Sequence, residues 1–173
     1  MKNIYLCGFM GCGKTTIGQQ LATQFGVGFL DTDQEIERRQ GKSIAELFLE
    51  GKEKAFRQME QELLHEFSGN ESLVIALGGG MLLPSRNATY AKGTGRVVLL
   101  ELPFEECYRR ISADQTRPLP MQMTKKELAA LYRRRRSCYR ASADFAIAAN
   151  HIPLVCAKQI HKIILDKERR VMR

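Results

Sequence analysis

Short apolar segments alternate with amphipathic segments along this chain. Apolar runs of strand length occur at 4–7, 27–30, 73–77, 96–101 and 145–148. Runs of this length and character are typical of strands in a parallel sheet that helices cover on both faces. The pattern therefore predicts an α/β fold, in which a five-stranded parallel sheet is the middle layer of a three-layer α/β/α arrangement.

Helical spacing of apolar residues fills most of the intervals between these runs. Ile17, Leu21 and Phe25 recur on one helical face after the first run. Ser43 and Glu46 have the spacing of a capping box, which starts a short helix. Further helices are predicted at 35–40, 52–67, 85–92, 104–111, 125–139 and 153–167.

Residues 112–124 lack an apolar period and contain Pro118 and Pro120, so we expect a mobile loop there, called the lid loop below. No internal repeat, low-complexity stretch or linker divides the sequence. A length of 173 residues suits one domain with a sizeable core. We therefore expect a single domain over residues 1–173.

Charge adds information about the ligands. The chain carries 27 Lys and Arg against 19 Asp and Glu, a net charge of +8, with much of the excess at 133–136 and in the C-terminal tail. A basic surface attracts nucleic acids, acidic membranes or small anionic substrates. The sequence has no recognisable nucleic-acid-binding motif and no apolar stretch long enough to span a bilayer. We therefore expect small anionic ligands, and neither nucleic acid nor a membrane as a partner.

The cysteines and the N-terminus indicate the compartment. The five cysteines are scattered and form no C-x-x-C pair, which favours free thiols in a reducing environment. The chain enters its first predicted strand without an export leader. We expect a cytoplasmic monomer.

The stretch from Gly8 to Thr15 fits the phosphate-loop pattern G-x-x-x-x-G-K-[ST] and lies between a predicted strand and a predicted helix, as that loop requires. Its glycines allow the backbone to wrap around an anion, and the N–H groups at the following helix start favour negative charge. Lys14 has the chemistry to reach the β- and γ-phosphates of ATP, and the Thr15 hydroxyl can ligate Mg²⁺. The residues expected to bind ATP here are Gly11, Cys12, Gly13, Lys14, Thr15 and Thr16.

Two carboxylates follow the second predicted strand. Asp31 is nearer the strand end, where it could hold a water on Mg²⁺, and Asp33 could bind substrate hydroxyls and accept a proton during transfer. Asp is also a favoured helix N-cap, so capping is the alternative role for one of the two.

Three consecutive glycines, Gly78 to Gly80, follow the third predicted strand and can offer backbone N–H donors to an anion or a hydroxyl. A flexible turn is the simpler interpretation. Arg57 lies three residues before Glu60, so the two can pair on one helical face. Its planar fork matches a carboxylate, but a surface ion pair is the default interpretation of such a pair.

Together these segments resemble the shikimate kinase family. The phosphate loop is shared with very many NTPases, whereas the combination of D-T-D, F-R-x-x-E, G-G-G and R-P-L is far more specific. The family is a P-loop NTPase, similar in fold to the nucleoside monophosphate kinases, and transfers the γ-phosphoryl of ATP to the 3-hydroxyl of shikimate on the route to chorismate and the aromatic amino acids. The residues that carry the resemblance are Gly8 to Gly18, Leu30 to Asp33, Gly41 to Ile44, Phe56-Arg57-x-x-Glu60, Leu77 to Gly80, Arg117-Pro118-Leu119 and Arg135-x-x-x-Tyr139.

The resemblance implies a set of shikimate ligands. Arg57 and Arg135 would bind the carboxylate of shikimate, and Gly79 and Gly80 would contribute from the backbone. Asp33 would hold ring hydroxyls, including the one that attacks. Four consecutive arginines leave the choice between Arg135 and Arg136 dependent on the register set by Tyr139, which favours Arg135.

The resemblance also implies roles on the ATP side. Lys14 and Thr15 would contact the phosphates and Mg²⁺, with Asp31 behind the metal ion. Arg117 would come from the lid loop and meet the phosphates on closure, and Arg110 would stack on adenine. The expected catalytic residues are Lys14, Asp33 and Arg117.

Two other functions remain open at this level. Another small-molecule kinase of the same fold, acting on a sugar acid or a nucleotide, would use similar carboxylate and hydroxyl ligands. A P-loop module that binds RNA or DNA would use the net charge of +8, and its binding would fall steeply with salt.

Overall fold

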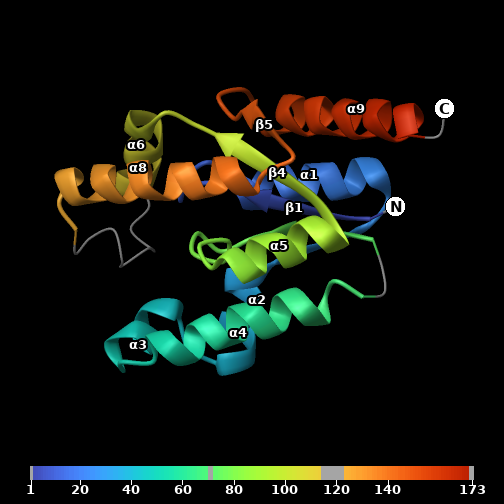
Figure 1. The fold of residues 1–173 in the computed structure, drawn as a ribbon. Coiled ribbons are helices and arrows are strands. Elements are labelled where there is room, and N and C mark those ends of the chain that lie inside the picture. Colours follow the sequence, from blue (N-terminus) through green and yellow to red (C-terminus); the bar gives the residue numbers. More distant parts are fainter. Residues whose placement is uncertain (1, 70–71, 114–122, 172–173) are drawn as a thin grey trace.

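The computed structural model describes residues 2–69, 72–113 and 123–171. A five-stranded sheet lies at its centre (Figure 1). The strands are β1 (Asn3–Cys7), β2 (Gly28–Asp31), β3 (Leu73–Ala76), β4 (Gly95–Glu101) and β5 (Phe145–Ala148). All neighbouring strands are parallel, in the order β2-β3-β1-β4-β5, which confirms the predicted five-stranded parallel sheet.

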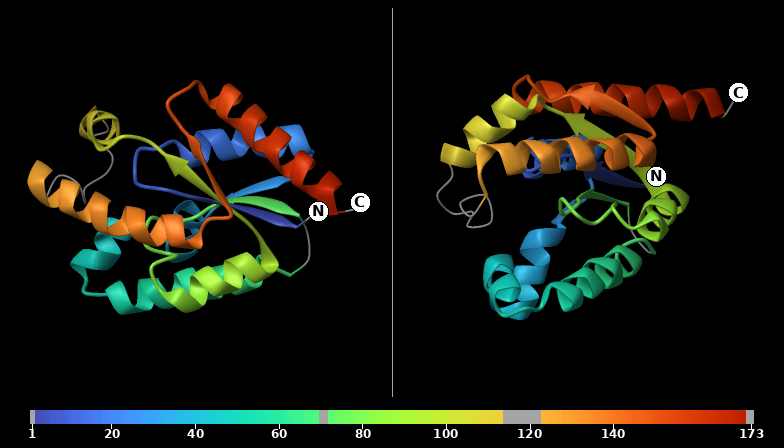
Figure 2. Two further views of the ribbon diagram at one scale, coloured as in Figure 1. Left: turned by 45° about the horizontal axis from the view of Figure 1, so that its top comes forward. Right: turned by 60° about the vertical axis from the view of Figure 1, so that its left-hand side comes forward.

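Helices flank the sheet on both faces, as the α/β/α prediction requires. Figure 2 shows α1 and α9, which pack against each other, on one face, and α5 and α8 on the other. A group formed by α2, α3 and α4 lies beyond α5 in Figure 1. The helices are α1 (Lys14–Phe25), α2 (Thr32–Gln40), α3 (Ile44–Leu49), α4 (Glu53–Glu66), α5 (Ser85–Thr94), α6 (Phe104–Ala113), α8 (Lys125–Ser142) and α9 (Pro153–Val171).

The main core surrounds strand β1, of which every residue is buried. Ile4, Tyr5 and Leu6 have no exposed surface, because helices cover both sides of this central strand. A second, smaller core lies among α2, α3 and α4 and consists of Ile36, Leu47, Phe56 and Leu63. The sheet with its covering helices and the α2–α3–α4 group are therefore stabilised by hydrophobic clusters of very different size.

Helix ends differ from the sequence predictions by a few residues. The predicted helix at 35–40 begins at Thr32, because Asp31 caps it with its carboxylate. Helix α8 begins at Lys125, where Thr124 and Glu127 form a second capping box that the sequence analysis missed. Of the lid loop, residues 114–122 lie outside the described part of the chain. Within residues 2–69, 72–113 and 123–171, no helix has the length and apolar character needed to cross a bilayer.

Candidate active site

The phosphate loop connects the buried strand β1 to helix α1. Gly11 and Gly13 adopt φ angles of 78° and 94°, a region that side chains rarely tolerate, and this permits the tight wrap of the loop. Lys14 is the first residue of α1, and its Nζ donates hydrogen bonds to the carbonyls of Gly8 at 3.0 Å and Phe9 at 3.3 Å. The loop thus places a cation at the positive end of a helix, where an anion is favoured.

A hydrogen bond between Thr15 and Asp31 connects the start of helix α1 to the end of strand β2. The Thr15 hydroxyl donates to Asp31 Oδ2 at 2.6 Å, while Asp31 Oδ1 accepts the N–H groups of Asp33 and Gln34. The capping role is therefore confirmed for Asp31, and the same carboxylate also faces the phosphate loop. Both side chains offer hard oxygen ligands, which suits Mg²⁺ bound by few protein groups together with phosphates.

Acidic and basic side chains of helix α4 line the same cleft as the phosphate loop. Arg57 Nη1 lies 2.6 Å from Glu60 Oε2 on α4, and only 2% of the Glu60 side chain is exposed. Burial raises the pKa of Glu60 to about 7, and the attraction of Arg57 opposes this shift without overcoming it. The simpler interpretation of this pair as a surface ion pair is wrong, because one partner is almost fully buried.

The three-glycine turn, Gly78 to Gly80, brings the predicted ligands together. None of these glycines has a positive φ angle, so their backbone conformation does not require glycine. A methyl group on Gly78 would overlap Asp33 Oδ1, one on Gly79 would lie 3.0 Å from Arg135 Nη1, and one on Gly80 would overlap Arg57 Nη1. The glycines of this turn leave room for three charged side chains that approach its backbone closely.

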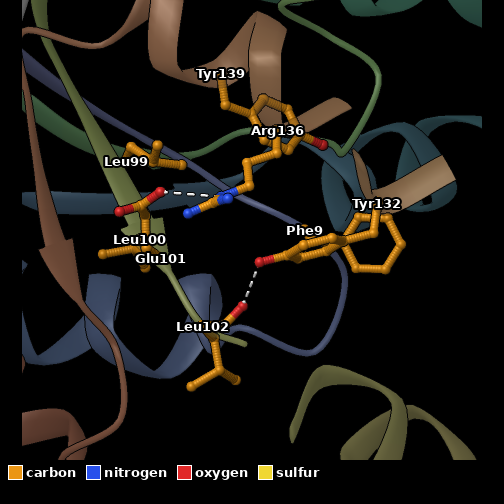
Figure 3. Close-up of a pocket in the computed structure, with 8 residues that line it drawn as sticks. All are labelled: Phe9, Leu99, Leu100, Glu101, Leu102, Tyr132, Arg136 and Tyr139. Atoms are coloured by element: carbon orange, nitrogen blue, oxygen red, sulfur yellow. Dashed lines mark hydrogen bonds and ion pairs between the residues drawn. The ribbon is translucent and has the colours of Figure 1, made fainter. Parts of the chain in front are cut away.

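The side chains of Arg135 and Arg136 have different surroundings. Arg135 lines the cleft next to Gly79, and its Nε is buried without a hydrogen-bond partner among the described residues. Figure 3 shows Arg136 turned away toward Glu101, whose carboxylate lies 3.3 Å from Arg136 Nε. Consecutive helical residues point about 100° apart, so only one of them can reach the turn.

These elements enclose a cleft of about 630 Å³. The side chain of Cys12 is buried and does not line it, so Cys12 contributes only backbone to the loop. Arg110 lines the cleft and donates to the carbonyl of Gly11 at 3.3 Å, while Arg117 lies outside the described residues. The predicted site residues that line the cleft are Gly11, Gly13, Lys14, Thr15, Thr16, Asp31, Asp33, Arg57, Gly79, Gly80, Arg110 and Arg135.

Comparison with known proteins identifies this arrangement. A family model described as shikimate kinase matches residues 10–165. A shikimate kinase from Persephonella marina is 41% identical over 148 residues, which cover 86% of this chain and 89% of that protein. The chain belongs to the shikimate kinase family.

Solved structures agree with this assignment. A shikimate kinase from Acinetobacter baumannii in complex with shikimate has a TM-score of 0.90 at 38% identity, covering 96% of this chain and 94% of that one. A deoxyadenosine kinase from M. mycoides, 12% identical with a TM-score of 0.66, shares the fold alone. As a member of the shikimate kinase family, the chain is an ATP-dependent phosphotransferase.

Two features of this shikimate kinase family member escaped the sequence analysis. Glu60 was expected only as a partner of Arg57, yet it is buried in the cleft wall and its Oε1 has no partner among the described residues. The hydroxyls of Thr32 and Tyr139 bond to the glycine turn. Both residues belong to quoted motifs, but the contact partners are far away in the sequence and gave no local signal.

Proposed function

We propose that the cleft binds ATP along the phosphate loop and shikimate against the glycine turn, and transfers the γ-phosphoryl group to the 3-hydroxyl of shikimate. One observation carries this proposal. Asp33, Arg57 and Arg135 each approach one glycine of the same turn, in the same cleft as the phosphate loop. A carboxylate and two guanidinium groups suit an acceptor that carries hydroxyls and one carboxylate.

In this proposal Arg57 and Arg135 bind the carboxylate of shikimate. A guanidinium offers two parallel N–H donors, which match a carboxylate in geometry and charge. Glu60 holds Arg57 in place through its 2.6 Å ion pair. The buried Glu60 Oε1 and Arg135 Nε lack partners among the described residues, and a polar ligand or its waters would supply them.

Asp33 is proposed to position the attacking hydroxyl and accept its proton. The hydroxyl oxygen forms a bond to the γ-phosphorus while the bond from that phosphorus to the β–γ bridging oxygen breaks, and the electron pair leaves with ADP. Asp33 lies in the first turn of α2 and lines the cleft. Phosphoryl transfer depends mainly on positioning and charge neutralisation, so one placed carboxylate is enough for the proton.

Positive charge around the phosphates comes from Lys14 at the loop, and Mg²⁺ would be held by Thr15 with Asp31 behind it. Bound there, the ion would supply positive charge that neutralises the phosphates. Arg110, beside the loop, is proposed to stack on adenine, and Arg117 to approach the phosphates from the lid loop.

We infer a monomeric enzyme made of one domain, since no second copy is needed to complete the proposed site. The five cysteines are free thiols, which supports a reducing compartment and hence the cytoplasm. Sedimentation equilibrium tests the first point, because a monomer gives the mass of one chain, 19.6 kDa, at every protein concentration.

The decisive experiment measures ADP release from Mg-ATP with shikimate, quinate, gluconate or a nucleoside monophosphate as acceptor. We expect turnover that requires shikimate and stops when EDTA removes Mg²⁺. Turnover with gluconate or a nucleotide instead would leave the ATP side intact and overturn the acceptor assignment.

A further inference from the structure

The carbonyl groups of the three-glycine turn are all occupied. Those of Gly78 and Gly80 accept N–H groups three residues further along the chain, each at 3.1 Å. The carbonyl of Gly79 instead accepts the phenol of Tyr139 at 2.5 Å, from a residue sixty positions away on α8. The middle carbonyl of the turn therefore depends on a single tertiary contact.

The N–H groups of the turn are used differently. Gly78 donates to the buried hydroxyl of Thr32 at 2.8 Å, and Thr32 Oγ1 in turn donates to the carbonyl of Ala76 at 3.3 Å. Among the hydrogen bonds of the described residues, none comes from the N–H of Gly79 or Gly80, and both glycines line the cleft. The N–H groups of Gly79 and Gly80 thus remain for a ligand, whereas all three carbonyls of the turn already accept hydrogen bonds.

Peptide geometry connects the Tyr139 bond to these donors. The carbonyl of Gly79 and the N–H of Gly80 belong to one trans peptide unit, so they point in opposite directions. Glycines on both sides of this peptide present no Cβ that would oppose its rotation. A flipped peptide would turn a carbonyl dipole toward an anionic ligand, where an N–H group is needed.

We propose that Tyr139 is a positioning residue that locks the Gly79–Gly80 peptide with the Gly80 N–H available to the acceptor substrate, and that Thr32 anchors the start of the same turn. This inference rests on the proposed function. Tyr139 lies one helical turn after Arg135, and Thr32 directly precedes Asp33. The two hydroxyls therefore also tie the turn to the helices that carry two proposed substrate ligands.

The test compares Tyr139→Phe with Tyr132→Phe. Tyr132 is on the same helix and also donates its phenol to a backbone carbonyl, that of Leu102 at 2.9 Å, outside the cleft (Figure 3). Each variant loses its hydrogen bond to a backbone carbonyl and keeps its ring, and Tyr139→Phe also removes the interaction of the phenol with Arg135. We expect Tyr139→Phe to raise the KM for shikimate about tenfold while the KM for ATP changes less than about twofold, and Tyr132→Phe to change neither by more than about twofold.

A purely structural role for Tyr139 predicts something else, namely equal effects of the two variants, or parallel rises in both KM values. Either result overturns the inference while the proposed function stands, provided the wild type turns over shikimate. A wild type that is inactive with shikimate overturns both.

Thr32 provides an independent test if Tyr139→Phe does not fold. Thr32→Val keeps the shape of the side chain and removes the hydroxyl, whereas Thr32→Ser keeps the hydroxyl. We expect Thr32→Val to raise the KM for shikimate about fivefold and Thr32→Ser to stay within about twofold of the wild type. Equal KM values for these two variants would overturn the role of Thr32 as an anchor of the turn.

Discussion

The two walls of the cleft are built in different ways. The phosphate side comes from one continuous stretch, the loop from Gly8 to Thr15, with Asp31 added from the end of strand β2. The acceptor side is assembled from α2, α4, the glycine turn and α8, and its two proposed arginine ligands, Arg57 and Arg135, lie far apart in the sequence. The phosphate side thus depends mainly on the local backbone conformation, and the acceptor side depends on how several elements pack together.

The cores beneath the two walls differ as well. The phosphate loop follows the fully buried strand β1 in the centre of the main core. In the α2–α3–α4 group, four buried apolar side chains form the second core, and Leu64 of α4 joins the main core. Regions with few buried contacts open more easily, so we expect hydrogen exchange to be faster in α3 than in β1. Because the two walls are proposed to bind different substrates, we expect substitutions on the phosphate side and on the acceptor side to change different kinetic constants.

The largest effect is expected on the phosphate side. Lys14→Ala removes the cation that stabilises charge on the transferring group, and we expect kcat to fall about 10³-fold. Steady-state kinetics at saturating substrates measures this, and thermal unfolding checks the fold. A loss below about tenfold would show that the loop does not act on the γ-phosphoryl group.

The next effect compares neighbouring arginines on the acceptor side. Arg135→Ala should raise the KM for shikimate about 100-fold with little change in the KM for ATP, because a charge-assisted contact is lost. Arg136→Ala breaks a half-exposed ion pair with Glu101 and should change either value by less than about twofold. The reverse order would move the proposed carboxylate ligand to Arg136.

A smaller effect concerns the pH dependence of stability. The folded pKa of Glu60 is raised to about 7, so the folded state holds this proton more tightly than the unfolded chain. The resulting contribution is complete below the unfolded pKa, near 4.5, and is lost as the pH rises through about 7. Relative to Glu60→Gln, the free energy of unfolding of the wild type should therefore fall by about 3 kcal/mol between pH 4.5 and pH 8.

Chemical denaturation at several pH values measures this difference. Glu62→Gln removes an exposed carboxylate from the same helix and serves as the control. Parallel curves for the wild type and Glu60→Gln would mean that Glu60 stays charged in the folded protein throughout this range.

The smallest effect tests why the turn contains glycine. Gly80→Ala places a methyl group on the Arg57 guanidinium, and we expect the displaced arginine to raise the KM for shikimate about tenfold. Gly93→Ala is the matched control, because a methyl group there meets nothing within 4 Å in helix α5 and should stabilise the fold by about 0.5–1 kcal/mol. An unchanged KM in Gly80→Ala would show that Arg57 can shift without loss of binding.

The features that depend on short-range order could be predicted from the residues alone. Apolar runs indicated the five strands, because parallel strands covered by helices are mostly apolar, and the partly exposed edge strands β2 and β5 also contain short apolar runs. The phosphate loop was identified because its chemistry needs glycines, a lysine and a hydroxyl at fixed spacing before a helix. The motif set also identified the family, and the predicted residues on the described part of the chain, apart from the Cys12 side chain, do line one cleft.

The arrangement of the acceptor side became visible only in the folded molecule. A run of four arginines does not reveal which one faces the glycine turn, since this depends on how α8 packs against the sheet. The burial of Glu60, and with it the raised pKa, arises from residues of other elements that exclude water. The hydrogen bonds of Thr32 and Tyr139 to the turn connect residues about 45 and 60 positions apart. Such contacts depend on the packing of whole elements, whereas the phosphate loop depends on the conformations of its own few residues.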